Sequence, residues 1–74
     1  MTQIPTLKPK KLIRIISKLG FKKIRQVGSH MFFRHPDGRS TVVPNHPGKD
    51  IGRGLLRAIM TDIKITSKEL LQLL

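Results

Sequence analysis

The 74-residue chain has no cysteine, tryptophan or tyrosine. Without cysteine it can form neither a disulfide nor a thiolate zinc site, so packing alone must stabilise the fold, a usage that fits a reducing compartment. No apolar run approaches the ~20 residues that a membrane-spanning helix needs, and the segment from Met1 to Leu7 is too short and polar for a signal-peptide core. We therefore expect a cytoplasmic protein that does not enter a membrane, built as one domain over residues 1–74.

Acidic residues are scarce, with four Asp and Glu against 15 Lys and Arg, which gives a formal charge of +11. This imbalance exceeds what solubility requires and indicates a polyanionic partner. A merely solvated face is the plain alternative, but a run of bases without a single acid before Asp37 favours phosphate binding at one strongly electropositive end of the fold. The bases in this run are Lys8, Lys10, Lys11, Arg14, Lys18, Lys22, Lys23 and Arg25.

The chain also has few groups that could carry catalysis. Its acids show no paired-carboxylate spacing and its three histidines match no standard zinc spacing, so we predict neither a metal site nor a cofactor. A single histidine can still cleave RNA, because the ribose 2′-hydroxyl is the nucleophile and an imidazole, with an ordinary pKa near ~6.5, needs only to remove its proton. His30, at the start of a predicted strand, is the main candidate. His35 is interpreted as an ordinary surface residue, and His46 fits a structural or binding role better than a catalytic one.

A first helix is predicted over residues 9–19. Pro9 suits a first helical turn, apolar residues follow at helical spacing, and Gly20 ends the pattern. The face opposite the apolar stripe carries a basic stripe at i, i+3 and i+7. Its members are Lys11, Arg14 and Lys18.

Two more helices are predicted after the strands. A helical period that begins at Ile51 covers about residues 50–62, where Gly52 and Gly54 weaken the first turns by about 1 kcal/mol each or allow a close approach of the backbone to the sheet or to RNA. Thr66 and Glu69 have capping-box spacing, which predicts a last helix over residues 67–74. We expect three leucines to anchor that helix: Leu70, Leu71 and Leu74.

Between the helices the apolar period changes to two, which predicts three antiparallel strands. The first starts at Phe21 and ends before Gly28-Ser29, and the others cover residues 30–35 and 40–44 around the hairpin signal Pro36-Asp37-Gly38. In the first strand one side should carry Phe21, Lys23, Arg25 and Val27. Phe32 and Phe33 must point to opposite faces, so one belongs to the core. The other either stacks on a base or is buried beneath a partner or a chain terminus, and we favour burial.

The predicted order is α-β-β-β-α-α. A three-stranded antiparallel sheet with helices on one face is an α+β two-layer fold, and this order is that of the double-stranded-RNA-binding domain. Such a topology does not by itself establish a function.

Five short motifs occur in register along the chain: Gly20-Phe21, Gly28-Ser29-His30 followed by Phe33, Asp37-Gly38, Val43-Pro44-Asn45-His46, and Gly54-Leu55-Leu56-Arg57-Ala58-Ile59. In this order and spacing the chain resembles the HicA-type mRNA interferase toxins over nearly its whole length. The resemblance implies a double-stranded-RNA-binding-domain-like fold, endonucleolytic mRNA cleavage, translation arrest, and neutralisation by a cognate HicB-type antitoxin. It also assigns the catalytic role of the Gly-Ser-His motif to His30.

The chain departs from the family pattern at two places. Met31 stands where a second histidine is common, and Leu55 replaces the threonine of a Gly-Thr-Leu motif, which removes a hydroxyl that could cap the helix or contact a phosphate. We expect the protein to be monomeric outside its antitoxin complex. The predicted RNA-binding residues are Lys11, Arg14, Lys18, Lys22, Lys23, Arg25, Ser29, Arg34 and His46.

Two other functions remain open at this point. A non-catalytic RNA-binding module would use the same helix and sheet to hold duplex RNA by its shape. A small DNA-binding or ribosome-associated structural protein would also suit the charge, since +11 attracts any nucleic acid, although no helix-turn-helix spacing supports it. The Gly-Ser-His motif favours the nuclease.

Overall fold

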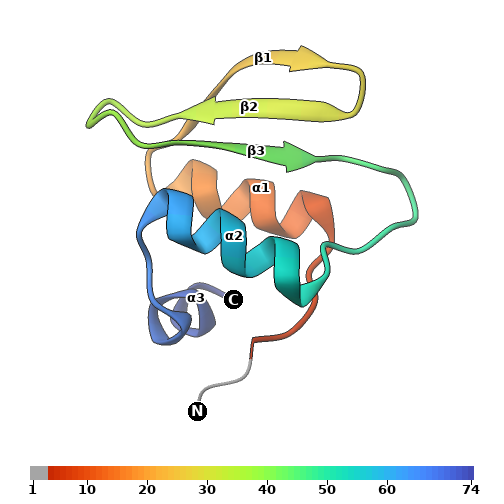
Figure 1. Ribbon diagram of the computed structural model, residues 1–74. Coiled ribbons are helices and arrows are strands. Elements are labelled where there is room, and N and C mark those ends of the chain that lie inside the picture. The colour runs from red at the N-terminus through yellow and green to blue at the C-terminus, as the bar shows by residue number, and fades with distance from the viewer. Residues whose placement is uncertain (1–3) are drawn as a thin grey trace.

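The computed structural model describes residues 4–74, so residues 1–3 of the predicted domain lie outside the described part. A helix, three strands and two helices follow one another along the chain (Figure 1). This order confirms the predicted α+β fold. The elements are α1 (Pro9–Lys18), β1 (Lys22–Val27), β2 (His30–Arg34), β3 (Ser40–Pro44), α2 (Arg53–Ile63) and α3 (Ser67–Leu73).

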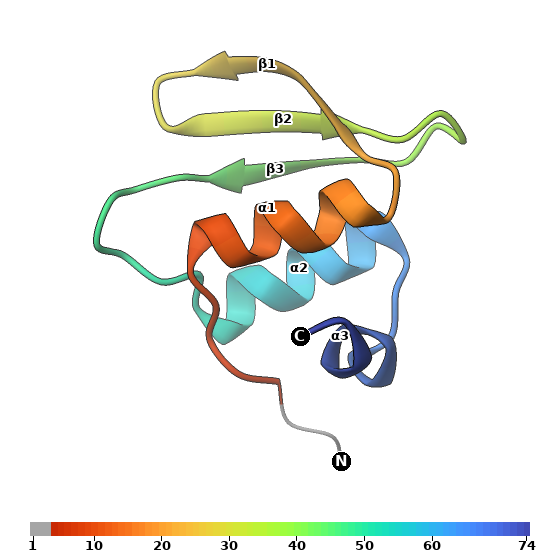
Figure 2. The same ribbon diagram turned by 180° about the vertical axis from the view of Figure 1, so that it is seen from behind.

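The three strands form one antiparallel sheet in the order β1-β2-β3, with β2 in the centre. Burial alternates along β2: Met31 and Phe33 are buried, whereas the residues between and beside them are more exposed. The buried side chains point to the inner face of the sheet, which α1 and α2 cover, and α3 lies beyond these two helices (Figures 1 and 2). The opposite face is called the outer face here, and no described helix packs on it. From β2 it presents His30, Phe32 and Arg34.

A β-bulge in β1 changes which side chains reach the outer face. Lys23 is opposite Phe33 but Arg25 is opposite Phe32, which leaves Ile24 as an extra residue between two paired ones. Because directly opposite residues share a face, Arg25 lies on the outer face and Lys23 on the inner one. The predicted alternation, which put Phe21, Lys23, Arg25 and Val27 on one side, is therefore wrong, since one inserted residue inverts the order of the faces.

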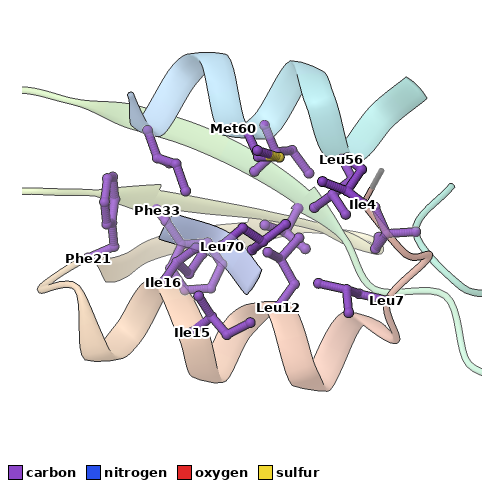
Figure 3. Close-up of a cluster of buried hydrophobic side chains, with 14 of the residues drawn as sticks. Ile4, Leu7, Leu12, Ile15, Ile16, Phe21, Phe33, Leu56, Met60 and Leu70 are labelled. Atoms are coloured by element: carbon purple, nitrogen blue, oxygen red, sulfur yellow. The ribbon is translucent and has the colours of Figure 1, made fainter. Parts of the chain in front are cut away.

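The core lies between the inner face of the sheet and the helices, as Figure 3 shows. Phe33 is 2% exposed, so it is the core member of the Phe32-Phe33 pair. Side chains of Leu12, Leu56 and Leu70 are fully buried and join α1, α2 and α3 to one cluster. Burying each such side chain contributes about 1.5–3 kcal/mol relative to exposure.

The predicted start of the second helix is wrong by about three residues. Ile51 does not belong to the helical period but forms an isolated bridge with Leu7, whose N–H donates to the Ile51 carbonyl at 3.2 Å and whose carbonyl accepts from the Ile51 N–H at 2.6 Å. Gly52 is the N-cap of α2 and leaves only Gly54 in the first turn. The bridge secures the segment before α1 to the segment before α2.

The last helix begins with the predicted capping box. The Glu69 N–H donates to the Thr66 hydroxyl at 3.1 Å, and the Thr66 N–H donates to the Glu69 carboxylate at 2.9 Å and lowers the pKa of that carboxyl. Leu70 is fully buried, but Leu71 and Leu74 are 38% and 43% exposed, so the expectation that all three leucines anchor the helix is wrong for two. Such a short helix turns one side only to the core. No helix within residues 4–74 is long and apolar enough to span a bilayer.

Candidate active site

The Gly28-Ser29 turn and the loop after β3 are joined at one end of the sheet. Gly28 adopts a φ of 58°, which suits a tight turn between antiparallel strands. The Asn45 N–H donates to the Ser29 carbonyl at 2.7 Å, and the Ser29 hydroxyl lies 3.2 Å from Nε2 of His46. These two contacts fix the segment that leads into His30.

His30 is the first residue of the central strand. Its Cα lies between those of Val27 on β1 and Pro44 on β3, so the backbone is held on both sides. Its side chain is exposed on the outer face. Within residues 4–74 the imidazole makes no hydrogen bond or ion pair with another side chain or with the backbone, so both ring nitrogens are available to a ligand.

The outer face carries three basic residues and one aromatic ring, together with the apolar Val27 and Val42. Lys22 is opposite Arg34, and Arg25 is opposite Phe32. The Cζ atom of Arg25 lies 4.4 Å from the centroid of the Phe32 ring, a cation–π contact. Phe32 is half-buried within the described chain, so burial beneath a described chain terminus is not seen, and burial beneath a partner stays a prediction. Its exposed part therefore faces whatever binds beside His30.

The structure brings together only part of the predicted site. Lys22, Arg25 and Arg34 share the outer face with His30, while Ser29 and His46 lie together at its end. The predicted basic stripe of α1 lies in the helical layer, on the other side of the sheet, with Arg14 and Lys18 exposed and Lys11 half-buried. The expected single electropositive end is therefore wrong, because bases that are neighbours in sequence are divided between two surfaces. Lys23 is separated from the outer face by the bulge.

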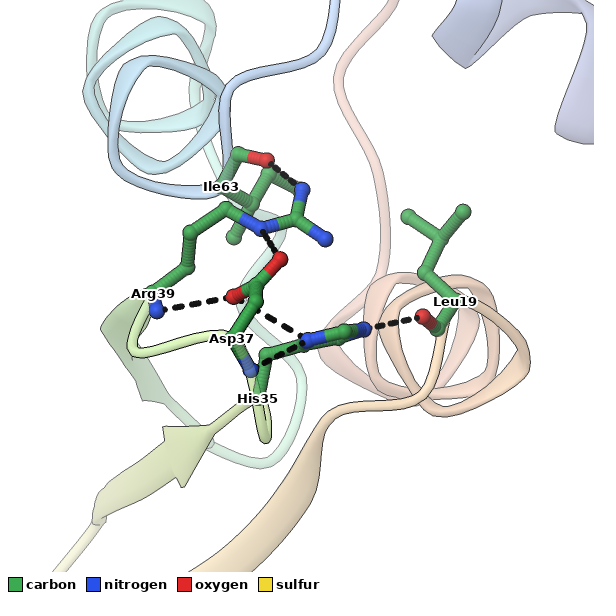
Figure 4. Close-up of polar contacts among 5 residues, drawn as sticks. All are labelled: Leu19, His35, Asp37, Arg39 and Ile63. Atoms are coloured by element: carbon green, nitrogen blue, oxygen red, sulfur yellow. Dashed lines mark hydrogen bonds and ion pairs between the residues drawn. The ribbon is translucent and has the colours of Figure 1, made fainter.

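His35, interpreted from the sequence as an ordinary surface residue, instead joins the β2–β3 hairpin to α1 (Figure 4). Its Nε2 lies 3.0 Å from the carbonyl oxygen of Leu19 and must carry the proton, since that oxygen only accepts. Its Nδ1 accepts from the Asp37 N–H at 3.1 Å. The imidazole also makes an edge contact with Phe21, at 5.0 Å between ring centroids.

Arg39 extends this network to α2. Its guanidinium donates to Asp37 at 2.8 Å and to the Ile63 carbonyl. The Arg39 backbone N–H also donates to Asp37, and together these bonds hold the pKa of that carboxyl below its ordinary value. The sequence could have predicted part of this network, because Asp37 lies two residues before Arg39, the spacing at which an aspartate side chain accepts a hydrogen bond from the backbone in a turn. We assign His35 and Arg39 to stability and not to the site around His30.

No group of three or more histidine, aspartate or glutamate side chains that could hold a metal ion lies together within residues 4–74. The candidate site consists of His30, the Ser29–His46 contact and the cations of the outer face. A site of this composition can bind an anionic chain and exchange a proton with it.

Fold and candidate site together define a small, strongly basic α+β protein with the α-β-β-β-α order and a histidine on a sheet face that no helix of residues 4–74 covers. Residues 9–65 match the family described as the HicA toxin of bacterial toxin-antitoxin systems. Because this match covers most of the chain, the protein belongs to the HicA toxin family and is a toxin of a toxin–antitoxin system. The match includes α1, the sheet and α2 but not α3. A comparison with curated proteins gave no match.

Proposed function

We propose that this toxin is an endoribonuclease that cleaves mRNA in the cytoplasm, with His30 as the general base. The observation that supports this most directly is the position of His30. Its backbone is fixed in the centre of the sheet, its imidazole is exposed and without a polar partner in the described chain, and its face carries cations and no acidic side chain of β1, β2 or β3.

The proposed step needs only a proton acceptor and charge stabilisation. The His30 imidazole takes the proton of a ribose 2′-hydroxyl, and the 2′-oxygen attacks the adjacent phosphorus. The bond from phosphorus to the 5′-oxygen breaks, and that oxygen takes a proton from water, leaving a 2′,3′-cyclic phosphate and a 5′-hydroxyl. Arg25 and Arg34 would stabilise the charge that develops on the phosphoryl oxygens. Since the substrate supplies its own nucleophile, the step requires no metal-activated water.

Purified protein should be incubated with a long unstructured RNA, with and without EDTA. We expect cleavage in both samples and fragments that end in cyclic phosphate and 5′-hydroxyl groups. Binding without cleavage would favour the non-catalytic RNA-binding module. Cleavage that EDTA abolishes would contradict the mechanism.

The salt dependence of RNA binding should identify the phosphate-contacting surface. Replacing Lys22, Arg25 and Arg34 by glutamine should flatten the log-log salt slope for a short single strand by about 2, since each neutralised phosphate contributes about 0.7. Charge reversal at Lys11, Arg14 and Lys18 should flatten the slope for a long RNA only, because this stripe lies beyond the sheet. The measurement is fluorescence anisotropy at several salt concentrations. An unchanged slope for the outer-face variant would exclude that face as the RNA surface.

The antitoxin should cover the same face. We propose that an acidic HicB-type protein blocks RNA by covering His30 and competing for its cations. Val27, which is opposite His30 on this face, and the bulge residue Ile24 are 58% and 59% exposed and could be buried in such a complex. Hydrogen exchange on the toxin–antitoxin complex should therefore protect the segment from Gly28 to Phe33. Protection confined to α3 would contradict occlusion.

A further inference from the structure

The aromatic ring nearest to His30 on the outer face is Phe32. The two residues are separated by one position in β2, so they point to the same side with Cα atoms about 7 Å apart. Phe32 is half-buried, and the Cζ atom of the Arg25 guanidinium lies over its ring, 4.4 Å from the centroid. A planar apolar group with a planar cation over it therefore lies on the same face as the candidate base.

Phe32 also lines a groove that the sheet shares with α2. Phe32, Arg34 and Val42 of the outer face line one part of this groove, and Leu55, Ala58 and Ile59 of α2 line another. Its lining is mostly apolar, and Arg34 is its one cationic residue. Its one acidic lining residue, Asp62 of α2, accepts a hydrogen bond from the Thr41 hydroxyl at 3.0 Å.

This combination of chemistry selects one kind of occupant. A polymer with negative charges at regular intervals and flat apolar groups between them fits both the cations and the ring. Unpaired RNA has these features, because its bases are free to stack on aromatic side chains or on guanidinium planes. Duplex RNA does not, because its bases are paired inside the helix and it presents mainly backbone and groove edges.

We propose that Phe32 and Arg25 form a stacking platform for one unpaired base next to the phosphate that His30 acts on, so that the substrate is single-stranded RNA. This proposal rests on the proposed ribonuclease function. In this arrangement Phe32 is a positioning residue: it holds the neighbouring nucleotide, and this places one 2′-hydroxyl at His30. The fold is of the double-stranded-RNA-binding type, yet the surface beside its candidate base is suited to a single strand.

The test measures binding to a strand that cannot be cut, so that it does not depend on catalysis. Fluorescent 2′-O-methyl oligonucleotides keep their bases and phosphates but lack the nucleophile. Phe32→Ala should bind the single strand about 5- to 150-fold more weakly, the range given by the loss of one base–aromatic stack. The salt slope should stay unchanged, because no charge is lost. Arg25→Lys should also weaken binding at an unchanged slope, since it keeps the charge and loses the plane.

Two controls separate stacking from general damage. Leu71→Ala removes another exposed apolar side chain, on α3 and away from the sheet, and should leave RNA binding unchanged. In a set of oligonucleotides that each lack one base, the wild-type protein should bind more weakly when the base is missing at one particular position. Removing that base should not change the affinity of Phe32→Ala, because both changes remove the same contact.

Three results would overturn the platform. The first is a folded Phe32→Ala variant that binds the single strand with wild-type affinity. The second is a wild-type protein that binds a matched duplex as tightly as the single strand, with the same dependence on Phe32. The third is an abasic scan in which no position affects binding. Loss of antitoxin binding alone in Phe32→Ala would assign the ring to a protein partner and would also overturn it. Failure of the ribonuclease proposal would be recognised separately, as absence of cleavage of unmodified RNA by the wild-type protein.

Discussion

Replacing His30 by alanine should lower the rate of RNA cleavage by about 10² or more while RNA binding persists. The side chain is exposed and the strand that carries it is held by backbone pairing with β1 and β3, so little packing is lost. The loss should therefore appear in the chemical step. Initial rates at saturating RNA measure it, with circular dichroism and thermal unfolding to verify the fold.

The matched control is the other histidine at this end of the sheet. His46 lies 3.2 Å from the Ser29 hydroxyl and is exposed in the loop after β3, so His46→Ala should loosen the segment before His30 and reduce the rate far less than His30→Ala. A 2′-deoxy nucleotide at the cut should abolish cleavage by the wild-type protein, because the nucleophile is missing. If a folded His30→Ala protein cut RNA at the wild-type rate while His46→Ala was inactive, the loop histidine would be the base.

The order of the elements could be predicted because local signals mark their ends. Pro9 and Gly20 bracket α1, Pro36-Asp37-Gly38 lies at the turn between β2 and β3, and Thr66 with Glu69 caps α3. The sequence predicts an element wrongly where a contact with a residue distant in the chain determines the local structure. Ile51 continues a helical period but pairs with Leu7, which lies far away along the chain.

The candidate site was predictable only in part. The Gly-Ser-His motif and the place at the start of a strand identify His30 as the candidate base. The Arg25–Phe32 contact could not be foreseen, because it depends on a bulge at Ile24 that only the pairing of β1 with β2 reveals. The division of the basic residues between two surfaces has the same origin, since the chain crosses from the helical layer to the sheet between Lys18 and Lys22. Composition thus sets the total charge, but the proximity of bases along the chain does not predict where that charge lies on the fold.

Replacing Gly20 by alanine should lower the free energy of unfolding by about 2–4 kcal/mol. Gly20 has a φ of 102°, a conformation that L side chains rarely adopt and that costs about 1–3 kcal/mol when forced. A Cβ atom there would also lie 2.9 Å from Nε2 of His35. That nitrogen donates to the Leu19 carbonyl, so the methyl group must displace the imidazole and break a part-buried hydrogen bond. Chemical denaturation measures the loss.

Gly38 provides a matched control, because its φ is 100° and a Cβ there would meet nothing within 4 Å. Gly38→Ala should therefore show the backbone strain alone, and the additional loss in Gly20→Ala, about 1–2 kcal/mol, measures the collision with His35. In a His35→Ala background the collision is absent, and Gly20→Ala should then be no more destabilising than Gly38→Ala, a coupling that a double-mutant cycle detects. Equal losses of unfolding free energy for the two glycine variants in the wild-type background would show that the close approach of Gly20 to His35 does not affect stability. The role assigned to His35 in joining the hairpin to α1 would then rest on its hydrogen bonds alone.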